Sequence, residues 1–162
     1  MAEVLTGPLA IAALVVGIAG SAKLRAPATA AGALLTLGVP GGPRVVRAVA
    51  VLELLAAGWC LAAPGRVAAV CLGCAYAVFA VTAVLLAHRQ AACGCFGGGE
   101  APVSAVHWML SAGLGIVCAL AAAWPPTRAT SVPLAIGVAG AAYAVVLVYT
   151  ELPTAWSAWS GR

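Results

Sequence analysis

Five long apolar runs constrain the fold of this chain more than any other feature of its sequence. They cover residues 4–22, 45–63, 67–87, 103–124 and 132–152, and each is close to the roughly 20 residues that a helix needs to cross a bilayer. Only 7% of the 162 residues are charged, whereas a soluble domain carries about 25%. The sequence therefore excludes a soluble globule and a disordered chain. It predicts an all-α polytopic membrane helix bundle with four or five transmembrane helices, in a single domain over residues 1–162.

The first apolar run has a second interpretation, as a cleaved signal peptide, because residues 19–22 are small. A basic segment before the apolar residues is missing, so a retained span is favoured. Small residues also recur at every fourth position of this run, at Ala13, Gly17 and Ser21. That spacing is typical of helices that pack closely in membranes.

A shorter apolar segment, residues 28–39, lies between Pro27 and Pro40. It is too short to span a bilayer, so we expect a short interfacial or re-entrant helix after the first span. Aromatic residues near the ends of the last two spans predict a belt at the membrane interface; they are Trp124, Tyr149, Trp156 and Trp159.

Glu53 lies near the middle of the second long run, where an ionisable side chain is costly and indicates a function by default. Its expected partner is Lys23 or Arg47, each at the interface. A proton-handling site and a structural ion pair are both open from the sequence, and a transport pathway is a weaker third interpretation. Cys60 follows seven residues later on the same helical face.

The most specific motif for chemistry is Cys93-Gly94-Cys95-Phe96-Gly97, in the polar loop of residues 90–102. A disulfide between residues i and i+2 closes a small, strained ring, and strain makes such a pair an exchanger rather than a structural link. The nearby cations His88 and Arg89 would favour a thiolate. We therefore predict Cys93 and Cys95 as the catalytic residues, supported by His88, Arg89 and His107. The alternative is a pair of loop cysteines without a role.

The other cysteines are weaker candidates for redox chemistry. Cys71 and Cys74 form a C-x-x-C on one helical face and are a candidate second dithiol. Cys60 and Cys118 are expected to be packing residues. The 19 residues from Cys74 to Cys93 span about 28 Å as a helix, so the two pairs should lie at opposite membrane faces.

That separation argues against a four-thiolate metal site, and no metal is expected. A weaker variant would combine the loop thiols with the two histidines, as a site of Cys93, Cys95, His88 and His107.

The order of these motifs resembles the MauE branch of the DoxX-like membrane proteins. The matching segments are residues 20–27 with Lys23, then Glu53-Leu54-Leu55, then the C-G-C-F-G loop, then His107-Trp108. The family usually carries an Arg-Asn pair soon afterwards, where this chain has Leu110-Ser111. The Cys71/Cys74 motif is outside the pattern.

The resemblance implies a redox-associated protein of the bacterial inner membrane. MauE is linked to the maturation of methylamine dehydrogenase, an exported enzyme rich in disulfides, together with a thioredoxin-like partner. A membrane thiol-disulfide oxidoreductase is therefore the first functional hypothesis, with electrons passing to a quinone in the bundle or to Cys71 and Cys74. Its partners would be the lipid bilayer and a thioredoxin-like protein or the exported client itself.

The second hypothesis is a non-catalytic assembly or scaffold subunit of a larger membrane complex. Such a subunit would dock through the small-residue helix faces Ser111/Gly115 and Gly137/Ala141. The net charge of +4 is too scattered for a nucleic-acid partner.

Two arguments disagree about which side of the membrane the thiol loop faces. The positive-inside rule makes the loop cytoplasmic, because most of the Lys and Arg residues share its side: Lys23, Arg25, Arg44, Arg47, Arg89 and Arg162. Disulfide chemistry belongs on the outer face, because the cytosol keeps thiols reduced. The conflict disappears if the four charges of residues 23–47 are held by packing or by Glu53, and on that expectation we favour an outward-facing loop.

Overall fold

The computed structural model describes residues 2–92, 94, 96, 103–126 and 132–160. Cys93, Cys95 and Gly97 lie outside the described residues, as does the side chain of Trp156. The described residues form six helices and no strand. These helices are α1 (Ala2–Arg25), α2 (Pro27–Thr36), α3 (Pro43–Ala62), α4 (Arg66–His88), α5 (Ala105–Ala123) and α6 (Val132–Ser160).

Five of these helices, all except α2, are long and apolar enough to cross a membrane. The predicted all-α bundle is therefore confirmed, and the short α2 follows the first span as expected. Helix α1 continues to Arg25, three residues beyond the predicted apolar run. It can do so because Lys23 is paired inside the bundle and does not need to reach water.

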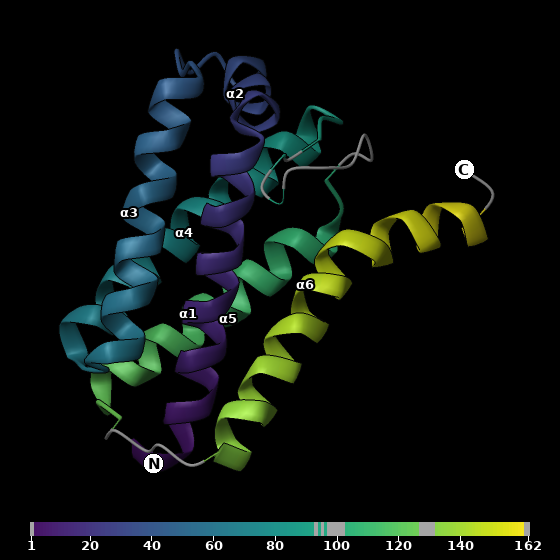
Figure 1. Ribbon diagram of the computed structural model, residues 1–162. Coiled ribbons are helices and arrows are strands. Elements are labelled where there is room, and N and C mark those ends of the chain that lie inside the picture. Colours follow the sequence, from purple (N-terminus) through teal and green to yellow (C-terminus); the bar gives the residue numbers. More distant parts are fainter. Residues whose placement is uncertain (1, 93, 95, 97–102, 127–131, 161–162) are drawn as a thin grey trace.

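The long helices run alternately up and down, so the start of α1 and the end of α6 lie toward opposite ends of the bundle (Figure 1). Helix α1 is central and contacts every other helix of the described chain. Helix α2 lies across the end of the bundle where α1 stops and α3 begins (Figure 1). Because α4 also finishes there, we call this the loop end.

Small residues allow α1 and α3 to pack closely. The buried residues of α3 recur every three or four positions and form one stripe: Val46, Ala50, Glu53, Ala57 and Cys60. A Cβ atom on Gly20 would lie 3.0 Å from the carbonyl oxygen of Ala50 and 3.3 Å from an oxygen of Glu53. The glycine therefore sets the distance at which α1 meets Glu53.

The extensive contact between α4 and α5 uses small residues in the same way. A Cβ atom on Gly115 would lie 3.5 Å from Cβ of Tyr76, and one on Gly73 would lie 3.4 Å from Cβ of Cys118. Ser111 is also buried. The prediction of a docking face at Ser111/Gly115 is therefore wrong, because small residues permit close packing inside the bundle as readily as outside it. On α6, Gly137 is exposed.

Helices α2 and α4 end with the same hydrogen-bond pattern. In α4, Gln90 has φ 54° and donates to the carbonyl of Ala87, while Ala91 donates to Leu86. This is the Schellman arrangement, and in α2 the residue with positive φ is Gly38. Farther on, the N–H of Val103 donates to the carbonyl of Ala91, which fixes both ends of the thiol loop.

Candidate functional site

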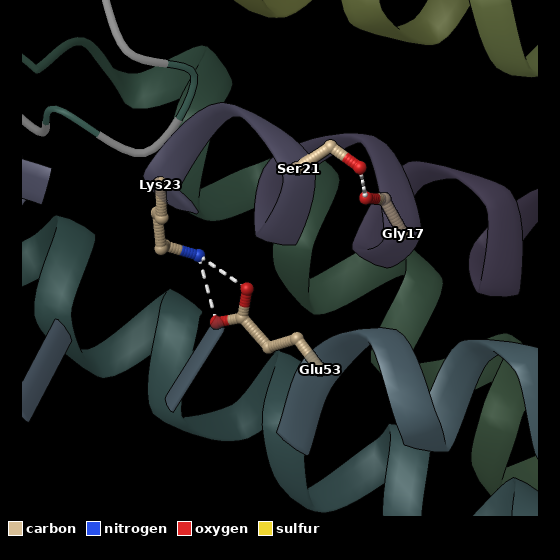
Figure 2. Close-up of polar contacts among 4 residues, drawn as sticks. All are labelled: Gly17, Ser21, Lys23 and Glu53. Carbon is tan, nitrogen blue, oxygen red and sulfur yellow. Dashed lines mark hydrogen bonds and ion pairs between the residues drawn. The ribbon is translucent and has the colours of Figure 1, made fainter. Parts of the chain in front are cut away.

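A buried ion pair joins the last turn of α1 to the middle of α3. Nζ of Lys23 lies 2.7 and 2.8 Å from the two carboxylate oxygens of Glu53, and both residues are buried. Figure 2 shows the two side chains reaching toward each other across the helix interface. Of the two predicted partners, Lys23 is the one that pairs, while Arg47 is exposed on α3.

The surroundings of Lys23 stabilise its positive charge. The ammonium lies 4.7 Å from the centroid of the Phe79 ring, within cation–π distance. Lys23 is in the last turn of α1, where the helix dipole favours a cation. Ser21 takes no part in the pair, because its hydroxyl donates to Gly17 within α1 (Figure 2).

A cavity of about 30 Å³ extends from Lys23 toward the thiol loop. It has room for a water molecule and is bordered by aromatic rings and a few polar groups. Its lining comes from α1, α4, α5, α6 and the loop: Val15, Ala19, Lys23, Tyr76, Phe79, Ala83, Phe96, His107, Ser111 and Tyr149. Three separate sequence motifs, those with Lys23, Phe96 and His107, therefore meet around one space.

His107 enters this cavity from the first turn of α5. The backbone N–H of Ser104 donates to its Nδ1 at 3.2 Å, as part of the capping box that starts the helix. This contact leaves the ring proton on Nε2. The histidine is thus oriented by the helix start that follows the loop.

Tyr149 of α6 also lines the cavity. Its hydroxyl is 3.0 Å from Oγ of Ser111, and its ring centroid is 5.8 Å from that of His107. The residue is 6% exposed, so its predicted place in an interfacial belt is wrong. Trp124 and Trp159 are exposed, as that belt requires.

The two described residues on either side of Cys95 are each held by a different helix. Gly94 has φ 64°, and a Cβ atom there would come within 2.7–2.9 Å of the backbone of Thr29 and Ala30 in α2. The ring of Phe96 lies 5.3 Å from that of Tyr149, centroid to centroid. The loop is therefore anchored to α2 at one point and to α6 at another.

The remaining predicted site residues lie apart from the cavity. Arg89 donates to the carbonyl of Thr36 at 2.8 Å and so ties α4 to the end of α2, while His88 is exposed. Cys71 and Cys74 are exposed free thiols in the first turns of α4, away from the loop end. Cys60 and Cys118 are buried in the core, as expected of packing residues.

The burial of the basic residues at the loop end differs from the sequence-based expectation. Lys23 is buried against Glu53, but Arg25, Arg44 and Arg47 are exposed. The prediction that packing or Glu53 would hold all four charges is therefore wrong for the three arginines, whose side chains reach outward from α1 and α3. The positive-inside rule still favours a cytoplasmic loop end.

Comparison with known proteins gave one result. A family model described as Methylamine utilisation protein MauE matches residues 1–125. The match runs from α1 through α5 and stops before α6. Searches of curated proteins and of solved structures found no match.

Proposed function

This chain belongs to the MauE family of integral membrane proteins, and from that premise we propose that it exchanges disulfides through Cys93 and Cys95. The partner is a thioredoxin-like protein or an exported client that needs disulfides. The family description concerns methylamine utilisation, so a client of the methylamine dehydrogenase type is the first to consider. We place the site of action at the outer face of a bacterial inner membrane because disulfides persist there. This placement goes against the positive-inside rule, which counts the exposed Arg25, Arg44 and Arg47 toward a cytoplasmic loop end.

The reaction is a pair of thiol–disulfide exchanges. A thiolate of the partner attacks one sulfur of the Cys93–Cys95 disulfide, the S–S bond breaks, and the released cysteine takes up a proton. The partner's second thiolate then attacks the mixed disulfide and releases the other cysteine. Two electrons and two protons move from the partner dithiol to the loop dithiol, and the partner leaves as a disulfide.

The observation that carries this proposal is the anchoring of the residues around the thiols. Gly94 contacts the backbone of α2 and Phe96 contacts Tyr149, while Val103 bonds to Ala91 across the base of the loop. A loop without a role has no need of such contacts. Anchoring instead favours a pair of thiols kept near each other for exchange.

The ion pair and His107 serve the same site in this proposal. Lys23 and His107 are among the polar residues that line the cavity, where a water molecule with polar neighbours can be held and can carry a proton to or from the thiols. Arg89 keeps α2 in place against α4. His88, at the end of the same helix, is exposed.

A quinone does not fit the cavity as it stands. A benzene-sized ring occupies a cavity on the order of 150 Å³, and this one has about 30 Å³. We therefore route no step through a quinone.

Trapping a mixed disulfide tests the proposal. The reduced Cys95→Ser variant, purified in detergent, is incubated with a thioredoxin that has one active-site cysteine replaced by serine and the other joined in a mixed disulfide to a small activated thiol. Attack by Cys93 would release that small thiol and leave Cys93 bonded to the thioredoxin, and adducts are resolved by mass spectrometry. We expect a one-to-one disulfide adduct through Cys93, and no such adduct through this loop in Cys93→Ser/Cys95→Ser.

The matched control is Cys71→Ser/Cys74→Ser, which removes two exposed thiols outside the loop and should leave the adduct at Cys93 or Cys95 unchanged. Adducts that form only through Cys71 or Cys74 would refute the proposal, as would a folded protein that forms none.

A further inference from the structure

We propose that three arginines at the loop end form a binding surface for the headgroups of anionic phospholipids. Arg25 ends α1, and Arg44 and Arg47 lie in the first two turns of α3. All three side chains are exposed. We call them the arginine surface. Its ligand is a lipid phosphate, so the proposal goes beyond thiol exchange and does not depend on it.

The three arginines lie at one level of the membrane. Helices α1 and α3 are both long enough to span it, and they run in opposite directions, so that α1 stops where α3 begins (Figure 1). Gly20 of α1 faces Ala50 of α3, because a Cβ atom on the glycine would lie 3.0 Å from the alanine carbonyl oxygen. Five residues nearer the loop end on each helix, Arg25 is level with the segment from Arg44 to Arg47. A helix that spans a bilayer reaches the lipid headgroups at this point.

The helices around the arginine surface offer it no carboxylate. Residues 2–92, which include α1 to α4, contain only two acidic residues, Glu3 and Glu53. Glu53 is taken by Lys23, and Glu3 lies in the first turn of α1, at the other end of the bundle. The positive charge must therefore be balanced from outside these helices. Phosphate is a suitable counterion, because a guanidinium group donates paired hydrogen bonds to its oxygens.

Helix α2 supplies an apolar part beside the arginines. Ala30 and Ala31 of α2 form a buried cluster with Val46 of α3, so α2 is held against the start of α3. Leu35, near the end of α2, and Val39, just after it, are exposed. An interfacial helix that combines exposed apolar residues with neighbouring basic residues is typical of surfaces that bind anionic lipids. The acyl chains meet the apolar residues and the phosphate meets the arginines.

The start of α3 is fixed in place and adds to the positive potential. A Cβ atom on Gly41 would lie 2.8 Å from Cδ1 of Leu34, so the turn before α3 packs directly on α2. Gly42 occupies the N-cap position and has no side chain to offer to the first N–H groups of the helix. The helix dipole therefore presents partial positive charge beside Arg44, which favours a phosphate.

Native mass spectrometry of the purified full-length protein in detergent tests the proposal. The protein is titrated with dioleoyl phosphatidylglycerol or dioleoyl phosphatidylcholine, which carry the same chains and differ in net charge. Each arginine close to an anionic lipid surface favours binding about fivefold. We therefore expect the parent protein to prefer phosphatidylglycerol by about a hundredfold at low salt. Each single Arg→Gln change should lower this preference about fivefold, and Arg25→Gln/Arg44→Gln/Arg47→Gln should remove it.

Arg66→Gln is the matched control, since it removes an exposed arginine at the start of α4, at the opposite end of the bundle. It should leave the preference unchanged. Inorganic phosphate should not displace the lipid, because it has no chains for the apolar part of the surface. Circular dichroism checks that each variant keeps its helices. Three results would overturn the proposal: full preference in the triple variant, a loss in Arg66→Gln equal to that in Arg44→Gln, or displacement of the lipid by an equal concentration of inorganic phosphate.

Discussion

Glu53→Leu is expected to destabilise the bundle severely, whereas Lys23→Met/Glu53→Leu is expected to fold. The single change leaves the ammonium of Lys23 buried without its carboxylate. Removing one partner of a buried ion pair costs about 3–5 kcal/mol, while replacing both by apolar residues of similar volume is often neutral or stabilising. Denaturant titration in detergent, followed by helical circular dichroism, measures the difference.

Arg47→Leu is the control for this pair, since it removes a charge from the exposed face of the same helix. Its effect on unfolding should stay within about 0.5 kcal/mol. If Glu53→Leu were as stable as the parent protein, the ion pair would not hold α1 to α3. The folded double variant also separates two roles: retained thiol exchange makes the pair structural, and lost exchange assigns it to the chemistry.

Gly94→Ala should release the thiol loop from α2. A non-glycine residue at positive φ is strained by about 1–2 kcal/mol, and a Cβ atom would also overlap the backbone of Thr29 and Ala30 at 2.7–2.9 Å. Because the atoms in the way belong to the backbone of α2, the overlap is relieved when the loop moves away from that helix. Because about 1.4 kcal/mol is a tenfold change in an equilibrium, we expect the reduced loop thiols to be alkylated at least tenfold faster.

Gly38→Ala supplies the control for backbone strain alone. Gly38 has φ 76°, and a Cβ atom there would meet nothing within 4 Å. The Gly38→Ala change should lower the stability of the C-terminal end of α2 without changing the alkylation rate of the loop thiols. Equal rates for Gly94→Ala and the parent protein would show that the contact with α2 does not restrain the thiols.

The bundle was predictable because membrane burial leaves little choice of secondary structure. A run of apolar residues in lipid must satisfy its own backbone, so hydropathy alone indicates helices. The partner of Glu53 was also within reach of the sequence. Arg47 is six positions before Glu53, about 240° around the helix at 100° per residue, so it cannot share the face that meets α1.

The cavity was not predictable, because it depends on how five segments distant in sequence meet. Tyr149 shows the difficulty: a tyrosine near a span end is as compatible with an interfacial belt as with a buried hydroxyl. Only the contact with Ser111 distinguishes the two. Gly94 likewise reads as a flexible neighbour of two cysteines until α2 is placed against it.

The central claim, a disulfide-exchanging loop on the outer face, is tested most directly by labelling intact cells with a membrane-impermeant maleimide. The peptide containing Cys93 and Cys95 is then examined by mass spectrometry, with and without mild prior reduction. The account predicts labelling only after reduction, as an outward-facing disulfide requires. Labelling confined to inverted vesicles, without any reductant, would mean cytoplasmic free thiols and would contradict it.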